Sequence, residues 1–213
     1  MLDSETPLKK SDLTRESILR AGAVIFAAEG YSTARLTDVA ALIGMKAGSL
    51  YYHFDSRESL VQAILERGMQ HTQGTLLATL AALPAGAGPL ERIRAAIECH
   101  FVVVVEQEEF SLATVKLFNQ IPQVLRQRHL RNLRAYAKLW RQLLKDAQAA
   151  KLLRPDINLS IMRMTIVGAL NSAPGWFRAG KLSAREVGRQ ISLILLRGMA
   201  AQPLHEAPVK RQR

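Results

Sequence analysis

The sequence lacks the features that mark secreted and membrane-embedded proteins. Cys99 is the single cysteine, so no intramolecular disulfide can form, and a reducing cytoplasm is the expected location. The strongest apolar run, Phe101–Val105, has five residues, whereas a membrane helix needs about 18. Asp3 and Glu5 precede any apolar stretch, which argues against a signal peptide. We therefore expect no association with a membrane.

Motifs of catalysis and of metal binding are also missing. The chain has no paired carboxylate and histidine motif, no Gly-rich phosphate loop and no Glu-x-x-His pattern. Cys99 and His100 are adjacent, but neighbouring side chains on a helix point about 100° apart, and no second ligand pair follows at i+4. We therefore predict that the chain is not an enzyme and that it has no catalytic residue, metal or cofactor.

Basic residues are in excess, but they are unevenly distributed. The 213 residues carry a net charge of +11, with 48% hydrophobic and 22% charged residues, as in a folded protein. Residues 1–68 contain 8 basic and 9 acidic side chains, net −1, and the remaining 145 residues contain 21 and 9, net +12. The overall charge is therefore no evidence that the N-terminal part binds nucleic acid.

The segment Leu36–Phe54 predicts two short helices with a tight turn. Thr37 is the expected N-cap of the first, because its hydroxyl can accept from a free backbone N–H. Gly44 ends that helix, since a positive φ costs glycine nothing. The second helix covers Lys46–His53. Two helices joined in this way are a helix-turn-helix, in which the second helix enters the DNA major groove.

The composition of the second helix favours DNA binding. Its residues are either small enough for close approach or carry donors that reach phosphates and base edges: Ala47, Gly48, Ser49, Tyr51, Tyr52 and His53. Two adjacent tyrosines on so short a helix cannot both be core, so we predict that one packs inward and the other faces outward. The alternative is an ordinary helical hairpin, because such corners occur in proteins that bind no DNA.

Residues Arg15 to Leu60, roughly a quarter of the chain, resemble the DNA-binding domain of the tetracycline-repressor (TetR) family of transcription regulators. Two positions depart from the family pattern: Gly22 stands where alanine is usual, and Arg57 replaces lysine. The matching residues are Arg15, Ile18, Leu19, Ala21, Phe26, Gly30, Tyr31, Leu36, Thr37, Ala40, Gly44, Gly48, Ser49, Leu50, Tyr51, His53, Phe54, Ser56, Arg57, Glu58 and Leu60.

The resemblance implies a ligand-responsive regulator, in the first instance a repressor, that binds a palindromic double-stranded DNA operator as a homodimer and is released by a small-molecule effector. The alternative is a constitutive DNA-binding regulator without an effector. By motif position, the implied DNA-backbone contacts are Thr37, Lys46, Ser49, Tyr51, His53 and Arg57. The implied base-facing residues are Ala47, Gly48 and Tyr52.

The whole chain is expected to be all-α. We predict a three-helix DNA-binding domain over residues 1–55, a larger helical effector-binding and dimerisation domain over 56–202, and a disordered basic tail over 203–213. The first helix is expected to begin near Ser11–Thr14 and end at Glu29. Ser56 caps a fourth helix that connects the two domains, and Pro84–Pro89 is the clearest break.

Two sets of residues in the C-terminal part are candidates for function. The last two helices, joined by Gly175–Leu182, carry more apolar residues than one buried face requires, which indicates a two-fold dimer with a four-helix interface. Its candidate residues are Ile166, Leu170, Trp176, Ile191, Leu195 and Met199. For an effector cavity, which the resemblance implies, the candidates are His100, Phe101, Val104, Phe118, Trp140 and Asn171. Each of these also fits a plain core position, which is the commoner role of such residues.

A basic run extends from Arg126 to Arg154, with Arg134, Lys138, Arg141 and Lys145 on one helical face. Such a face is either solvated or paired with an acidic segment such as Glu106–Glu109. Alternatively, it meets the phosphates of an anionic effector such as a CoA thioester. The segment from Leu153 to Trp176 also resembles family members that respond to acyl-CoA-type ligands.

Overall fold

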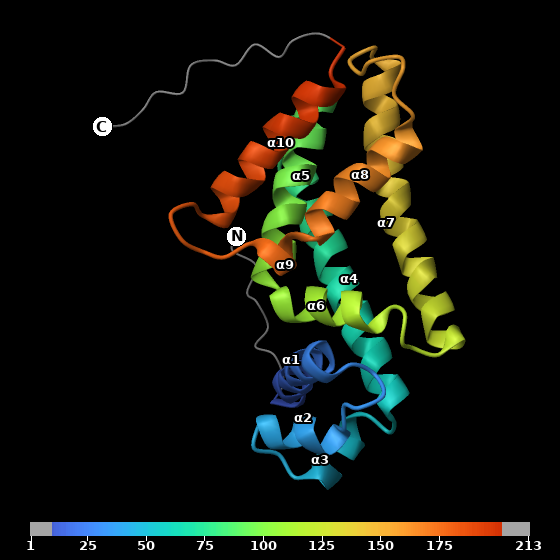
Figure 1. Ribbon diagram of the computed structural model, residues 1–213, viewed down its shortest axis with the longest axis vertical. Coiled ribbons are helices and arrows are strands. Elements are labelled where there is room, and N and C mark those ends of the chain that lie inside the picture. The colour runs from blue at the N-terminus through green and yellow to red at the C-terminus, as the bar shows by residue number, and fades with distance from the viewer. Residues whose placement is uncertain (1–9, 202–213) are drawn as a thin grey trace, which may run out of the picture. The chain divides into compact units, whose positions relative to one another are not determined.

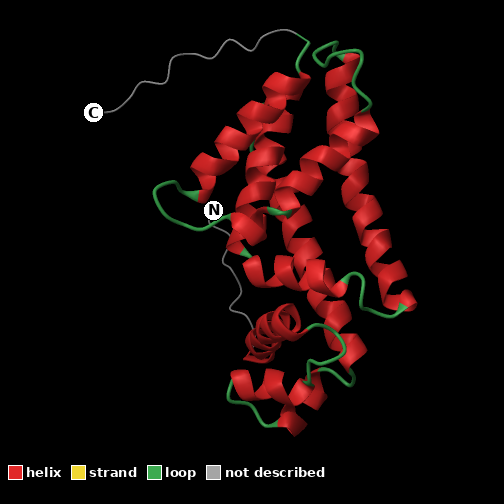
Figure 2. Cartoon of the chain, in the orientation of Figure 1, coloured by secondary structure: helices red, strands yellow, loops and turns green. Residues whose placement is uncertain are grey.

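The computed structural model describes residues 10–201, and every regular element in this range is a helix (Figures 1 and 2). The all-α prediction is therefore confirmed for the described chain. The predicted basic tail over 203–213 lies outside the described residues. The helices are α1 (Lys10–Glu29), α2 (Leu36–Leu42), α3 (Ala47–His53), α4 (Arg57–Ala81), α5 (Pro89–Glu106), α6 (Glu108–Leu117), α7 (Gln123–Ala149), α8 (Leu159–Asn171), α9 (Ala173–Trp176) and α10 (Ala184–Met199).

Glycines and side-chain caps mark several helix ends, and one predicted cap is misplaced. Gly44 takes φ of +66° after α2, as predicted, and Gly30 takes φ of +84° after α1. The side chain of Asn158 caps α8, and Ser183 and Glu186 form a capping box at α10. The predicted N-cap at Thr37 is wrong. The N-cap of α2 is Arg35, whose carbonyl accepts from the N–H groups of Asp38 and Val39 without any side-chain cap.

The chain packs into two compact units, and two helices contribute to both. The first unit combines the segment up to His71 with Gln107–Leu133, and the second combines Thr72–Glu106 with the segment from Arg134 onward. Consequently α4 and α7 each begin in the first unit and end in the second. The functional limits predicted at residues 55 and 56 remain a prediction.

The core of the first unit is built by α1–α4 together with α6 and the start of α7. Phe26, Leu50 and Ile64 are fully buried, and they share one hydrophobic cluster with Phe110 and Leu117 of α6. Figure 1 shows α6 lying across α1 within this unit. The helix-turn-helix is thus held by residues that follow it in the sequence by more than fifty positions.

The departure at Gly22 has a packing reason. A Cβ placed on Gly22 would lie 2.8 Å from Cδ1 of Ile64 and 3.4 Å from a methyl of Leu60, both on α4. Helix α1 therefore approaches α4 more closely than an alanine would allow without a shift of Ile64.

In the second unit, α5 packs against α10, α8 and α9. The contact with α10 is close at Gly188, where an added Cβ would lie 3.4 Å from the carbonyl oxygen of Glu98. An isolated antiparallel bridge pairs Leu153 with Ala200. Among the described helices, none is long and apolar enough to cross a bilayer.

Candidate nucleic-acid interface and effector site

Helix α3 is anchored by one residue and presents the others outward. The Leu50 side chain is fully buried in the core of the first unit, and Phe54 behind it is also buried. The Lys46 carbonyl accepts from the N–H groups of Ser49 and Leu50, which starts the helix directly after the turn at Gly44. Lys46, Gly48 and Ser49 are exposed, and Ala47 and His53 are half-buried. The first unit therefore offers these predicted DNA contacts on one short, firmly seated helix.

Both tyrosines of α3 face solvent, which corrects the prediction that one packs inward. Tyr51 is 51% exposed and Tyr52 is 88% exposed. Their inward place is taken by Leu50, which precedes them, so neither ring is needed to seat the helix. The Tyr52 ring meets the edge of the His53 ring, with centroids 5.5 Å apart. Two large aromatic donors are thus free to meet a partner, and Tyr52 is the more prominent.

Thr37 and Arg57 occupy different surroundings from the residues of α3. Thr37 is exposed on α2, and its hydroxyl lies 3.5 Å from Asp38 Oδ1. The Arg57 guanidinium donates to the carbonyl oxygens of Tyr31 (3.1 Å) and Ser32 (3.4 Å) and stacks on the Tyr31 ring at 5.6 Å. Arg57 therefore ties the turn after α1 to the start of α4. Its role as a phosphate contact remains a prediction.

Tyr31 and Glu58 are two neighbours of this site that the sequence did not single out as functional. The Tyr31 hydroxyl donates to Glu58 Oε1 at 2.5 Å. This hydrogen bond lowers the pKa of Glu58, while burial and the same carboxylate raise the pKa of Tyr31 to about 12. Tyr31 and Glu58 are 27 residues apart, and no rule of helical or strand spacing relates such positions. The contact therefore could not be predicted from the sequence.

The second unit contains a buried polar cluster around His100 of α5. His100 Nδ1 is hydrogen-bonded to the Tyr136 hydroxyl, and Nε2 lies 2.9 Å from Asn171 Oδ1. Burial lowers the pKa of His100 to about 4, so the imidazole is neutral at pH 7. Nε2–H then donates to Asn171, and Nδ1 accepts from Tyr136. The Trp140 ring meets His100 edge-on at 6.0 Å.

Only part of the predicted effector set comes together. His100, Trp140 and Asn171 belong to one cluster, and sequence reasoning missed its fourth member, Tyr136, although it precedes Trp140 by one helical turn. Phe101 is buried in the same unit against Trp176 and Phe177, and Val104 is buried as well. Phe118 lies in the first unit instead, where its ring meets His129 at 6.1 Å and the Arg126 guanidinium at 6.0 Å.

Comparison with known protein families agrees with this arrangement. Residues 18–64 match the family of bacterial regulatory proteins, tetR family, and residues 86–199 match the tetracyclin repressor-like C-terminal domain. The chain belongs to the TetR family. This is a family of bacterial transcription regulators, and the predicted family is confirmed.

Individual TetR proteins resemble this chain over most of its length. The transcriptional repressor KstR2 of Mycolicibacterium smegmatis is 29% identical over 195 residues, covering 87% of this chain and 90% of that one. The structure of the ketosteroid regulator KstR2 of Mycobacterium tuberculosis has a TM-score of 0.79 at 22% identity and covers 95% and 98% of the two chains. The structure of AibR with isovaleryl coenzyme A and operator DNA has a TM-score of 0.75 at 20% identity, covering 85% and 97%.

The predicted dimer residues of this TetR chain divide into buried and accessible ones. Ile166, Leu170 and Met199 are fully buried within the chain, and Ile191 and Leu195 are half-buried. Trp176 is exposed. Three further exposed apolar side chains, which were not predicted, lie on α8 and α10: Ile161, Met164 and Ile194, the last 68% exposed.

The basic stripe of α7 is solvated in this TetR chain. Arg134, Lys138, Arg141 and Lys145 are all exposed, and among the described residues none of the ion pairs involves them. Tyr136 and Trp140 are buried on the opposite face of the same helix. A single compact ligand therefore cannot touch the stripe and the His100 cluster without passing around α7.

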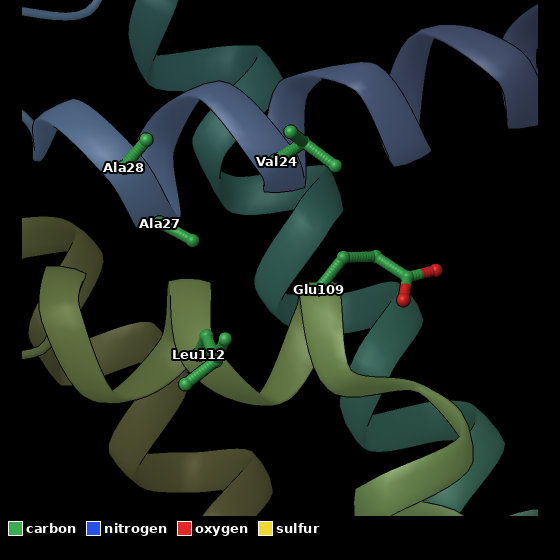
Figure 3. Close-up of a pocket in the computed structure, with 5 residues that line it drawn as sticks. All are labelled: Val24, Ala27, Ala28, Glu109 and Leu112. Atoms are coloured by element: carbon green, nitrogen blue, oxygen red, sulfur yellow. The ribbon is translucent and has the colours of Figure 1, made fainter. Parts of the chain in front are cut away.

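A surface hollow of about 400 Å³ lies between α1 and α6 in the first unit (Figure 3). Val24, Ala27 and Ala28 form one wall, and Leu112 and Glu109 form the other. Glu109 accepts from Arg20 at 2.8 Å, so its charge is balanced within the unit. None of these residues was among the predicted sites. Among the described residues, no group of three or more acidic, histidine or cysteine side chains is arranged to hold a metal ion.

Proposed function

We propose that this TetR family member is a cytoplasmic, ligand-responsive repressor that binds a palindromic operator as a homodimer. The observation that carries the proposal is the outward face of α3. Its aromatic and polar side chains are exposed, while Leu50 alone seats the helix. A recognition helix requires this division, because residues that reach base edges cannot also hold the helix in the core.

We assign five residues to contacts with the phosphate backbone of the operator: Lys46, Ser49, Tyr51, His53 and Thr37. Ala47, Gly48 and Tyr52 are assigned to the bases, because Tyr52 extends furthest and the two small residues permit close approach. Arg57 is assigned a backbone role through the turn that it holds, in addition to any phosphate it meets. The near-neutral charge of residues 1–68 means that affinity must come from a few well-placed donors.

For assembly, the accessible apolar residues of α8, α9 and α10 support a two-fold interface. Ile161, Met164, Trp176 and Ile194 expose large apolar surfaces that a monomer would leave in water. An isologous interface over these helices covers them, with Ile191 and Leu195 beside them. Two recognition helices held about 34 Å apart can then read the two halves of a palindrome.

For the effector, the His100 cluster is the site that we favour. It offers a neutral imidazole, a tyrosine hydroxyl and an amide among buried aromatic rings, the mixture typical of pockets for lipophilic ligands with few polar groups. KstR2 is named a ketosteroid regulator, and AibR was solved with isovaleryl coenzyme A. Lipophilic acids and their CoA thioesters are therefore the first effectors to test. An effector that prefers the non-binding conformation lowers operator affinity by its differential affinity alone.

Binding to the DNA upstream of the protein's own coding region tests the proposal. Gel shift or fluorescence anisotropy is expected to show a specific complex with two copies of the chain per palindrome, and the free acid or its CoA thioester is expected to dissociate it. Absence of binding to any upstream palindrome would contradict the repressor assignment. A calorimetric response to neutral lipophiles but none to CoA esters would exclude the thioester class.

A constitutive regulator without an effector is the second candidate. It is favoured by the completeness of the His100 network, in which both ring nitrogens already have partners inside the chain. In that case the cluster is structural, and operator affinity stays constant across the effector screen.

A further inference from the structure

We propose that Gln120, in the loop between α6 and α7, is a positioning residue for operator binding. Its side chain fixes the turn that leads into the helix-turn-helix, although Gln120 lies 89 residues after Tyr31 in the chain. The inference rests on the proposed operator-binding function. All the contacts that carry it lie within the first unit.

The Gln120 carboxamide occupies a fitted position at the end of α1. Its Oε1 accepts from the backbone N–H of Tyr31 at 2.8 Å. A Cβ on Gly30 would lie 2.5 Å from the same oxygen. Gly30 also has φ of +84° and donates to the Phe26 carbonyl at 3.0 Å. The positive φ favours glycine here, and a larger residue at position 30 would displace the Gln120 carboxamide.

The loop that carries Gln120 is itself held in place. The N–H groups of Gln120 and Ile121 donate to the Leu117 carbonyl at 2.8 and 3.0 Å, and Ile121 is buried in the unit's core. Arg126 of α7 donates to the carbonyls of Asn119 (3.1 Å) and Ile121 (3.4 Å). Gln120 is thus a fixed group, and its hydrogen bond restrains Tyr31.

Tyr31 passes this restraint to both ends of the helix-turn-helix. Its carbonyl accepts from Arg57, and its hydroxyl donates to Glu58, at the start of α4 directly after α3. In the other direction the chain continues from Tyr31 through buried Ala34 into α2. The entry and the exit of the helix-turn-helix therefore meet at Tyr31, and Gln120 fixes Tyr31 from outside.

A purely stabilising role gives a different result from a positioning role. Gln120 is exposed, so Gln120→Ala creates no cavity, and the fraction of folded protein stays close to one well below the melting temperature. A stabiliser would then leave operator affinity unchanged. If Gln120 is a positioning residue, Gln120→Ala weakens binding to all operator variants alike, by up to about tenfold, because the exposed hydrogen bond that restrains Tyr31 is lost.

The experiment measures operator affinity by fluorescence anisotropy for the full-length protein, with two further variants. Gln120→Glu keeps an acceptor for the Tyr31 N–H and is expected to restore wild-type affinity. Asn119→Ala removes the neighbouring exposed amide, whose side chain has no part in these contacts, and is expected to bind as wild type does. Equal affinities of wild type and Gln120→Ala, or equal losses in Gln120→Ala and Gln120→Glu, would overturn the proposal.

Amide hydrogen exchange separates this inference from the repressor assignment, because it needs no DNA. In Gln120→Ala we expect faster exchange at Tyr31 and through α2 and α3, with α5 unchanged. Faster exchange confined to residues 118–122 would overturn the positioning role. If wild type fails to bind upstream DNA while the exchange result holds, the proposed function is wrong and the restraint by Gln120 stands.

Discussion

The outer face of α3 and the cluster around His100 both combine tyrosine with histidine, yet their surroundings are opposite. On α3 the two tyrosine rings face solvent, and Tyr52 meets the edge of the His53 ring. In the cluster, Tyr136 and His100 are buried and hydrogen-bonded to each other, with Asn171 completing the network. Residue types alone therefore do not distinguish a surface available to a partner from a network that already has its partners.

This difference means that the two regions respond to substitution in different measurements. Loss of a side chain on α3 should change binding and leave the fold intact. Loss of a side chain in the His100 cluster should mainly lower the free energy of unfolding. An effector role for the cluster would appear as an additional change in ligand response.

The largest expected effect is that of Trp140→Ala. Trp140 is fully buried beside His100 and Tyr136, and removing its ring should lower the free energy of unfolding by about 3–5 kcal/mol. Chemical denaturation measures the loss, with Tyr52→Ala as the control that should stay within about 0.5 kcal/mol of wild type. A small loss for Trp140→Ala would mean that this cluster is not a packed core.

The pH dependence of stability is the next effect. His100 has a folded pKa of about 4 against an ordinary value of 6.5, so between these values the unfolded chain binds more protons. The contribution of His100 is therefore fully present above pH 6.5 and declines as the pH falls towards 4, by on the order of 3 kcal/mol in total.

Denaturation of wild type and His100→Gln at several pH values isolates this contribution. Burial also lowers the pKa of His129, but His129 is present in both proteins and cancels in the difference. Parallel stability curves for the two proteins would contradict the buried neutral imidazole.

Tyr52→Ala is expected to act on binding alone. If Tyr52 faces the bases, its removal should cost about 1–3 kcal/mol of discrimination among operator variants. Because the side chain is 88% exposed, the free energy of unfolding should not change. Titration of a set of single-base operator variants decides this, and an unchanged order of preference would remove Tyr52 from the base-facing set.

Arg57→Ala is expected to lower both the stability of the fold and the affinity for DNA, each by a smaller amount than the largest effects above. The guanidinium supports two backbone carbonyls, so we expect a loss of about 1 kcal/mol in stability and a weaker, sequence-independent affinity for DNA. Arg57→Lys keeps the charge but not the planar fork. If the lysine variant recovers affinity without recovering stability, a phosphate contact is indicated. A change in base preference would contradict the assignment.

The smallest effect is expected on the basic stripe of α7. The double substitution Lys138→Gln and Arg141→Gln removes two exposed charges that form no ion pair with another described residue. Stability should therefore change by less than about 0.5 kcal/mol. Calorimetry with a CoA thioester and with the matching free acid provides the functional comparison. A loss of thioester binding in this variant would assign the stripe to the effector.

The elements and the recognition helix were predictable because their signals are local. Glycine at positions 30 and 44, the caps at Ser56, Asn158 and Ser183, and the apolar spacing of each helix depend on neighbours within one or two turns. The inward orientation of Leu50 in place of a tyrosine was not predictable, because it depends on how deeply α3 inserts into the core. The misplaced cap at Thr37 has a similar origin, since burial of Leu36 shifts the start of α2 by two positions.

Contacts between segments that are distant in the chain could not be predicted from the sequence. Three hydrogen-bonded pairs follow from the tertiary fold, and no rule of sequence spacing predicts them: Tyr31 with Glu58, Gln120 with Tyr31, and His100 with Tyr136. The separation of buried from accessible residues on α8 and α10 is of the same kind, because it depends on which helices pack against each face.

The composition of the first unit has a consequence for recombination and for protein engineering. Its core includes Phe110, Leu117 and Leu125 from a segment that is inserted, in chain order, between two parts of the second unit. A chimera made with a single crossover after the helix-turn-helix would pair α1 with a foreign α6. Exchanging the operator specificity of this regulator therefore requires either transplanting residues 10–71 together with 107–133, or limiting the exchange to the exposed positions of α3.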